Sequence, residues 1–202
     1  GRRLMVGPVY MDTDDGKGTT WHFDRLVGTS SGKYDKFPNV SNNIEVAQSD
    51  GDSIIALATY ADRLLQFKKN RMALINITKS AEYLEDTFEG KGVEHPAAVF
   101  ETDYGITWAN KDGCYLYDGK QVHNLIEGKI ADDTWSDSHF DSNTLVGYHS
   151  NSRKIIVTGG GTNNRHAYVF DLNLKCWTYY GNIFTDLPMT NFVRNSDGDL
   201  IW

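Results

Sequence analysis

Apolar runs separated by short polar turns recur along this chain. Residues 56–68 form an apolar run, a turn at Ala61 and Asp62, and a second apolar run. The same arrangement returns at 97–109, 144–158 and 190–202, with a weaker copy at 19–30. Apolar segments of this length bounded by turn residues indicate β-hairpins. The pattern therefore predicts an all-β protein.

Each of these turns contains an aspartate or asparagine at a regular distance from the next. The five anchor residues are Asp24, Asp62, Asp103, Asn151 and Asp197, and successive anchors are 38, 41, 48 and 46 residues apart. Blades of β-propellers repeat at about 40–50 residues. Asp and Asn tolerate left-handed turn geometry and bond their own backbone, so we expect both properties at the anchors. The repeat predicts that residues 1–202 form one propeller segment, with about four to five four-stranded antiparallel blades.

A bulky residue follows four of the anchors by five positions. These residues are Phe67, Trp108, Ile156 and Trp202. Each falls on the second strand of its predicted hairpin. We expect their side chains to point into the packing between blades.

The unit around Asn151 is the most complete, and it predicts strands near 144–149, 153–158, 166–171 and 175–180. It resembles a kelch repeat: a glycine pair follows the second strand, a tyrosine lies in the third and a tryptophan in the fourth. The residues that carry this resemblance are Gly159, Gly160, Tyr168 and Trp177.

The unit around Asp103 predicts strands near 97–101, 105–109, 113–118 and 121–125. Its sequence TDYGITW resembles the Asp-box turn of sialidase-type propellers, although Glu101 stands where that motif has serine. The resemblance implies a structural turn away from any active site. Elsewhere we expect a short helix over 125–134 and strands near 4–11 and 21–29.

Composition and charge narrow the function classes. The net charge is −7, the pI is about 5.3 and the basic groupings are short, which disfavours nucleic-acid contact. No apolar run approaches the roughly 18 residues that span a bilayer, so no membrane insertion is expected. The two cysteines, Cys114 and Cys176, make neither a metal-binding pair nor a disulfide framework.

Three groups of residues have the residue types of catalytic or metal-binding sites. Gly28 to Gly32 spell G-x-S-x-G, but a nucleophile elbow needs a helix directly after Ser30, and KYDKFPNV has no helical periodicity. The acidic loop Asp12, Asp14 and Asp15 lacks the further ligands of an EF-hand.

The best metal or acid–base candidate is the alternating set Asp137, His139 and Asp141. An extended strand would place all three on one face, where carboxylate and imidazole groups share a divalent ion. No second histidine lies at a fixed ligand spacing, and the segment also fits a polar connection between blades. We therefore expect no catalytic site, no bound metal and no cofactor.

The order of several phrases resembles propeller-type virion structural proteins of tailed bacteriophages. These are GRRLMVG at 1–7, KYDKFP at 33–38, DGDSIIAL at 50–57, YADRLLQFKKN at 60–70, the segment 95–120 and NLIEGKIADDTW at 124–135. The resemblance implies a non-enzymatic, tail-associated part of the particle, assembled in the host cytoplasm and packed against other virion subunits.

Two alternatives remain open at this point. One is a carbohydrate-binding propeller that recognises a host-surface glycan, with exposed rings such as Trp135 stacking on sugars. The other is a sialidase- or lyase-like propeller enzyme. Because Trp202 falls on the second strand of a predicted blade, we also expect the chain to belong to a longer protein or to be completed by a partner.

Overall fold

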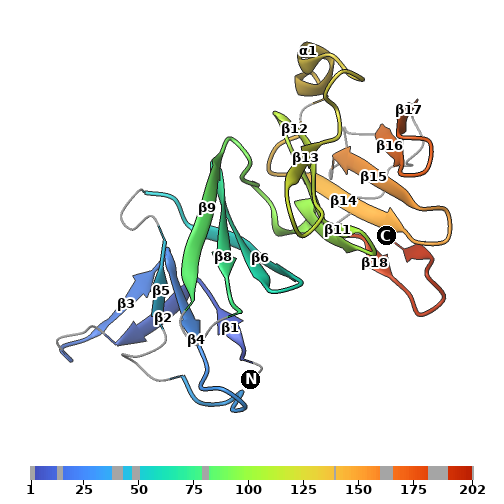
Figure 1. The fold of residues 1–202 in the computed structure, drawn as a ribbon. Helices are drawn as coiled ribbons and strands as arrows, with labels where there is room; N and C mark the ends of the chain where they lie inside the picture. The colour runs from blue at the N-terminus through green and yellow to red at the C-terminus, as the bar shows by residue number, and fades with distance from the viewer. Residues whose placement is uncertain are drawn as a thin grey trace.

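The structure is a computed structural model, and it describes residues 3–12, 16–37, 43–46, 51–78, 82–138, 140–159, 166–181 and 191–201. Within these ranges the chain is built from β-strands joined by turns (Figure 1). Two short helices interrupt them in the described ranges, the 3-10 helix η1 (Pro96–Ala98) and α1 (Asp132–Ser136). The all-β prediction is confirmed, and the helix expected over 125–134 begins later and is shorter.

Among the described residues, three antiparallel sheets each contain four strands in chain order. The first of them contains β6 (Ile54–Tyr60), β7 (Arg63–Lys68), β8 (Arg71–Asn76) and β9 (Tyr83–Glu89). The next contains β10 (Val99–Thr102), β11 (Gly105–Asn110), β12 (Gly113–Tyr117) and β13 (Val122–Asn124). The third contains β14 (Thr144–His149), β15 (Lys154–Gly159), β16 (Ala167–Asp171) and β17 (Cys176–Tyr180). The eight strands predicted for the Asp103 and Asn151 units are therefore present, with ends shifted by a few residues.

Smaller sheets flank these three. The N-terminal sheet has the order β1–β4–β5, formed by β1 (Met5–Val6), β4 (Arg25–Gly28) and β5 (Asn43–Glu45). β2 (Val9–Asp12) and β3 (Thr19–His22) form a separate two-stranded ribbon. β18 (Val193–Arg194) pairs with β19 (Leu200–Ile201) at the other end.

The prediction for Asp24 is wrong. The turn at Asp24 joins β3 to β4, and these strands lie in different sheets, because β3 pairs with β2 whereas β4 pairs with β1 and β5. Gly7 and Pro8 interrupt the opposite strand at the same level, and proline has no N–H to donate to a ladder. Asp24 thus marks a break within one long, bent hairpin, while the other four anchors lie in turns between the paired strands of a hairpin.

Successive sheets pack face to face through apolar clusters. The β6–β9 sheet meets the β10–β13 sheet around Phe67 and Trp108, whose ring centroids are 5.2 Å apart, and both side chains are fully buried. Ile156 is half-buried against Leu145, Phe192 and their neighbours, between the β14–β17 sheet and the final hairpin. The expectation for the bulky residues is confirmed at these three positions, and Trp202 lies outside the described residues.

The first strands of successive sheets form a row. β6 contacts β10, β10 contacts β14, and β14 contacts β18. Sheets stacked face to face with their first strands side by side are the arrangement of propeller blades around an axis. The described strands do not close this row into a ring. None of the described helices is long and apolar enough to cross a membrane.

Candidate functional site

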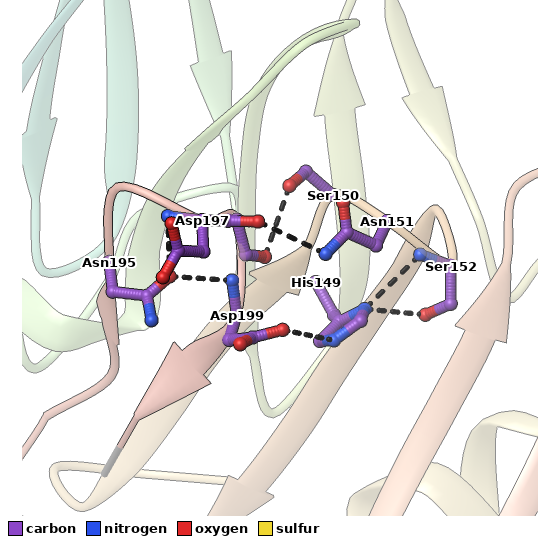
Figure 2. A network of polar contacts seen from close by, with 8 residues as sticks. His149, Ser150, Asn151, Ser152, Asn195, Asp197 and Asp199 are labelled. Carbon is purple, nitrogen blue, oxygen red and sulfur yellow. Dashed lines mark hydrogen bonds and ion pairs between the residues drawn. The ribbon is translucent and has the colours of Figure 1, made fainter.

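Two neighbouring hairpin turns are joined by polar contacts at one end of the sheets (Figure 2). Ser150 Oγ donates to the carbonyl of Gly198 and Asn151 Nδ2 donates to the carbonyl of Asp197, each at 3.1 Å. His149 Nε2 lies 3.7 Å from Asp199 Oδ1. These contacts tie the β14–β15 turn to the β18–β19 turn, which are 46 to 50 residues apart in sequence.

Asp103 links this pair of turns to the preceding sheet. Its Oδ2 accepts a hydrogen bond from the Tyr148 hydroxyl at 3.1 Å, and its Oδ1 accepts from Arg194 Nη1 at 3.2 Å. Burial is the main cause that raises the pKa of Tyr148 to about 12, and the bond to Asp103 adds to it. Tyr148 therefore stays a neutral donor at physiological pH, which matches the acceptor role of Asp103.

The anchor residues act differently from the prediction. In the Asp62 and Asn151 turns the left-handed backbone conformation falls on Ala61, with φ of 52°, and on Arg153, with φ of 54°, instead of on the anchor residue. The side chain that bonds the turn backbone is also a neighbour of the anchor. Thr102 Oγ1 accepts from the Tyr104 N–H at 3.1 Å.

Equivalent neighbours act in the two later turns. His149 Nδ1 accepts from the Ser152 N–H at 3.1 Å, and Asn195 Oδ1 accepts from the N–H groups of Asp197 and Asp199. Because Thr102 and His149 bond the backbone of these turns, the side chains of Asp103 and Asn151 can form hydrogen bonds with other hairpins. The spacing of the anchors located the turns correctly but did not reveal these long-range contacts.

A cleft of about 610 Å³ lies over these turns. It is lined by Asp103, Ser150, Asn151, Arg194, Asn195, Ser196, Asp197 and Gly198. Much of the polar side-chain capacity in this lining bonds other parts of the same chain. Among the described residues there is no group of three or more His, Cys, Asp or Glu side chains placed to hold a metal ion.

Asp137 and Asp141 do not lie on one strand. Asp137 is the C-cap of α1, where its N–H bonds the Asp133 carbonyl, and Asp141 lies in a turn where its carboxylate accepts from the Asn143 N–H. The extended strand that would have placed these residues on one face is not formed at Asp137 or Asp141, because a helical turn and an Asx turn replace the period-two geometry. His139 lies outside the described residues.

The other two motifs also fall in turns. β4 ends at Gly28, and the described residues after Ser30 form turns and bends, with the Lys33 N–H bonded to the Ser30 carbonyl. The described residues 31–37 are not helical, so the helix that a nucleophile elbow requires directly after Ser30 is not formed. Asp14 and Asp15 lie outside the described residues, as does Gly160 of the kelch-like pair, whereas Gly159 is the last residue of β15.

Trp135 is not an exposed ring, which corrects the expectation that it stacks on sugars. It is fully buried on α1, and its Nε1 donates to the carbonyl of Asn110 at 2.9 Å. Its ring lies 5.3 Å from Tyr168 and 5.5 Å from Trp177. Trp177 Nε1 donates to the carbonyl of Leu125 at 2.9 Å. The kelch-like tyrosine and tryptophan thus help fix the connection between two sheets.

Sequence reasoning missed an exposed aromatic surface on the β2–β3 ribbon. Tyr10 and Trp21 are cross-strand partners whose rings are 5.2 Å apart, and Trp21 stacks on Phe23 at 6.2 Å with an interplanar angle of 17°. All three side chains are more than half exposed. We name these three residues the aromatic ribbon face. The available signal was the occurrence of three aromatic residues within 14 positions, on both sides of the acidic loop at 12–18.

Comparisons with known proteins bear on the fold alone. No protein-family model matches the sequence, and no curated protein matches it. Among solved structures, Hsv2 of Kluyvelomyces marxianus, a propeller, is similar with a TM-score of 0.51 and 11% identity over 89% of this chain. The chain spans about half, 54%, of the length of that protein. An all-β, propeller-like fold is what this similarity supports.

Proposed function

We propose that this chain is a non-enzymatic structural component of a bacteriophage particle, associated with the tail, which packs against neighbouring virion subunits. In this proposal its sheets are four to five blades of a propeller, with turn anchors near residues 62, 103, 151 and 197. The phrase order from GRRLMVG to NLIEGKIADDTW supplies the virion assignment, and the aromatic ribbon face supports a protein-binding role.

The aromatic ribbon face is the observation that carries the protein-binding part. A two-stranded ribbon is at best marginally stable alone in water, and β2–β3 pairs with no other described strand. Three contiguous aromatic side chains on such a ribbon form an apolar surface of the kind that marks protein contacts. Tryptophan and tyrosine are also the residues that dominate binding energy at interfaces. Burial against a neighbouring subunit would stabilise both the ribbon and the assembly.

The chemistry of the turn cleft supports a non-enzymatic role. Asp103 bonds Tyr148 and Arg194, and Asn151 bonds the neighbouring turn. A general acid or base needs a free position for substrate within hydrogen-bond reach, and these groups instead hold sheets together. The cleft is therefore a seam between blades in this proposal.

A carbohydrate-binding role is the second candidate, and the near-parallel Trp21 and Phe23 rings favour it. Flat aromatic surfaces stack on the apolar faces of sugar rings. Glycan arrays screened with the wild-type chain and with Trp21→Ala test this candidate. Binding to a defined glycan that Trp21→Ala abolishes would replace the protein-binding assignment of the ribbon face.

The proposed function is tested on purified particles of the virus that encodes the chain. Antibodies against residues 1–202 should label the tail region in immunogold electron microscopy. A double variant, Tyr10→Ser with Trp21→Ser, should reduce incorporation into particles by roughly tenfold or more, because hot-spot aromatics contribute about 2 kcal/mol or more each. Leu174→Ser, at a 73% exposed position in the β16–β17 turn, is the matched control and should incorporate normally. Particles without the protein would refute the proposal.

A further inference from the structure

A groove beside β1 occupies the place where the next strand of the N-terminal sheet would lie. It has a volume of about 1350 Å³, larger than the roughly 300–1,000 Å³ of small-molecule pockets. One wall is the edge of β1, with Arg3, Leu4 and Met5, and the opposite wall is β6, with Leu57 and Thr59. β1 lies at the edge of its sheet, because the strand order is β1–β4–β5.

The backbone of Met5 points into this groove. In an antiparallel ladder, alternate residues direct both their N–H and C=O toward one partner strand. Leu4 directs its groups toward β4, since its N–H bonds Thr29 Oγ1 at 3.0 Å and its carbonyl accepts from the Thr29 N–H at 2.9 Å. Met5, the next residue, pairs with Gly28 and therefore turns its own N–H and C=O to the open edge. A strand placed there would be able to form hydrogen bonds with the N–H and the C=O of Met5.

The row of first strands points to the same position. β6, β10, β14 and β18 contact one another in succession, and the groove adjoins β6 on the side away from β10. Its floor continues an existing interface between sheets. Met5, Leu57, Leu64 and Ile77 belong to the apolar cluster that joins the N-terminal sheet to the β6–β9 sheet, and they also line the groove. A strand in the groove would extend that cluster as the first strands of the other sheets extend theirs.

Charged and polar residues also line the groove. Arg3 Nη1 donates to Glu82 Oε1 at 2.6 Å, and both side chains are mostly buried, at 24% and 13% exposure. This pair joins the N-terminal sheet to the segment before β9. Asp62 and Thr78 also line the groove. A groove lined by both apolar and polar residues suits an extended peptide whose apolar side chains alternate with polar ones.

We propose that this groove binds an extended segment of a partner polypeptide, which adds as an antiparallel β-strand to the edge of β1. The occupant has the composition of the chain's own first strands, in which apolar residues mix with Thr, Gly or Ala, as in TLVGYH of β14. Backbone hydrogen bonds to Met5 give affinity, and small apolar side chains against Leu57 and Leu64 give specificity. The site is separate from the aromatic ribbon face and does not depend on the virion assignment.

The test uses the full chain and a fluorescent peptide with the sequence of residues 142–151, SNTLVGYHSN. Fluorescence anisotropy should show saturable binding, and a peptide with the same side chains but N-methylated alternate amides should not bind. Thr59→Trp, at an exposed position of the groove wall, should weaken binding by roughly tenfold or more, equivalent to about 1.4 kcal/mol. Thr178→Trp, the same change at an exposed position of β17, should leave binding unchanged.

Thermal unfolding of each variant is the control for the fold, and both variants should unfold cooperatively near the wild-type midpoint. Equal binding of the N-methylated peptide, or no loss in Thr59→Trp, would overturn the proposal. Concentration-dependent dimers that Thr59→Trp disrupts, without any peptide binding, would assign the groove to a second copy and would also overturn it. Loss of particle incorporation in the ribbon variant with normal peptide binding separates this site from the proposed function.

Discussion

Arg194 donates from Nη1 to Oδ1 of Asp103 at 3.2 Å and joins the final hairpin to a turn 91 residues earlier. The other carboxylate oxygen of Asp103 accepts from Tyr148, which lies on the sheet between them in sequence. One carboxylate therefore connects three successive hairpins. Local turn chemistry does not need Asp103, because Thr102 bonds the turn backbone, so its contribution is to the packing of sheets.

The two partners of Asp103 should contribute unequally to stability. The side chains of Arg194 and Asp103 are 37% and 56% exposed, so the ion pair itself should be worth no more than about 1 kcal/mol. Asp103→Ala also leaves the hydroxyl of the buried Tyr148 without its acceptor, so it should cost about 1 kcal/mol more than Arg194→Ala. Urea denaturation of the two single variants and the double variant measures both terms. Equal costs for the two single changes would contradict this assignment.

Alkaline pH should destabilise the protein through its buried hydroxyls. Burial raises the pKa of Tyr115 and of Tyr148 from 10.0 to about 12. Because the folded-state pKa is the higher one, the folded state holds its protons longer than the unfolded state. The stability they contribute is fully present below pH 10 and is lost as the pH rises toward about 12. Denaturation midpoints measured across this range should fall, and Tyr148→Phe should make the fall less steep. A slope unchanged by Tyr148→Phe would mean that Tyr148 ionises equally in both states.

The Phe67–Trp108 contact should contribute strongly to the packing of the β6–β9 sheet against the β10–β13 sheet. Trp108→Ala removes a fully buried ring and should cost about 3–5 kcal/mol. Trp108→Phe should cost clearly less, because the Trp108 Nε1 has no hydrogen-bond partner to lose. Trp21→Ala removes a 55% exposed ring and should change the free energy of unfolding by about 0.5 kcal/mol or less. Similar losses for Trp108→Ala and Trp21→Ala would show that the sheets do not depend on this contact.

The sequence predicted the strands well because hairpins leave a local signal. Apolar runs with a turn residue between them placed the strands of the Asp103 and Asn151 units within a few residues. The bulky residues Phe67 and Trp108 were also predicted between sheets, because each follows its turn anchor by five positions and falls on the second strand of its hairpin. Both signals act over fewer than about ten residues.

Features that depend on long-range pairing were missed or mistaken. Asp24 has the local sequence of a hairpin turn, yet its flanking strands pair with different partners. Trp135 lies in a polar segment and reads as exposed, but α1 places it against Tyr168 and Trp177. The groove beside β1 follows from the strand order, which periodicity alone does not contain. The spacing of residues along the sequence revealed the repeat, whereas the candidate sites depend on contacts between residues that are far apart in sequence.

Gln66 should be a position where an apolar residue stabilises the protein. Its side chain is fully buried on β7, and neither Nε2 nor Oε1 has a hydrogen-bond partner. Its cross-strand partner Ala73 belongs to the apolar cluster between the N-terminal sheet and the β6–β9 sheet, so the amide faces that cluster. A buried polar group without partners costs about 1–3 kcal/mol, and leucine is close to glutamine in volume. Gln66→Leu should therefore raise the free energy of unfolding by about 1 kcal/mol.

Chemical denaturation of Gln66→Leu beside Gln121→Leu measures this effect. Gln121 is exposed, and its Nε2 lies 3.4 Å from His123 Nε2, so its replacement should change stability by no more than about 0.5 kcal/mol. A gain at position 66 without a gain at position 121 separates the burial of an unpaired amide from a general effect of added leucine. If Gln66→Leu instead lowers stability by about 1 kcal/mol or more, the amide forms hydrogen bonds inside the interface, and a buried water is the simplest partner for both of its polar atoms.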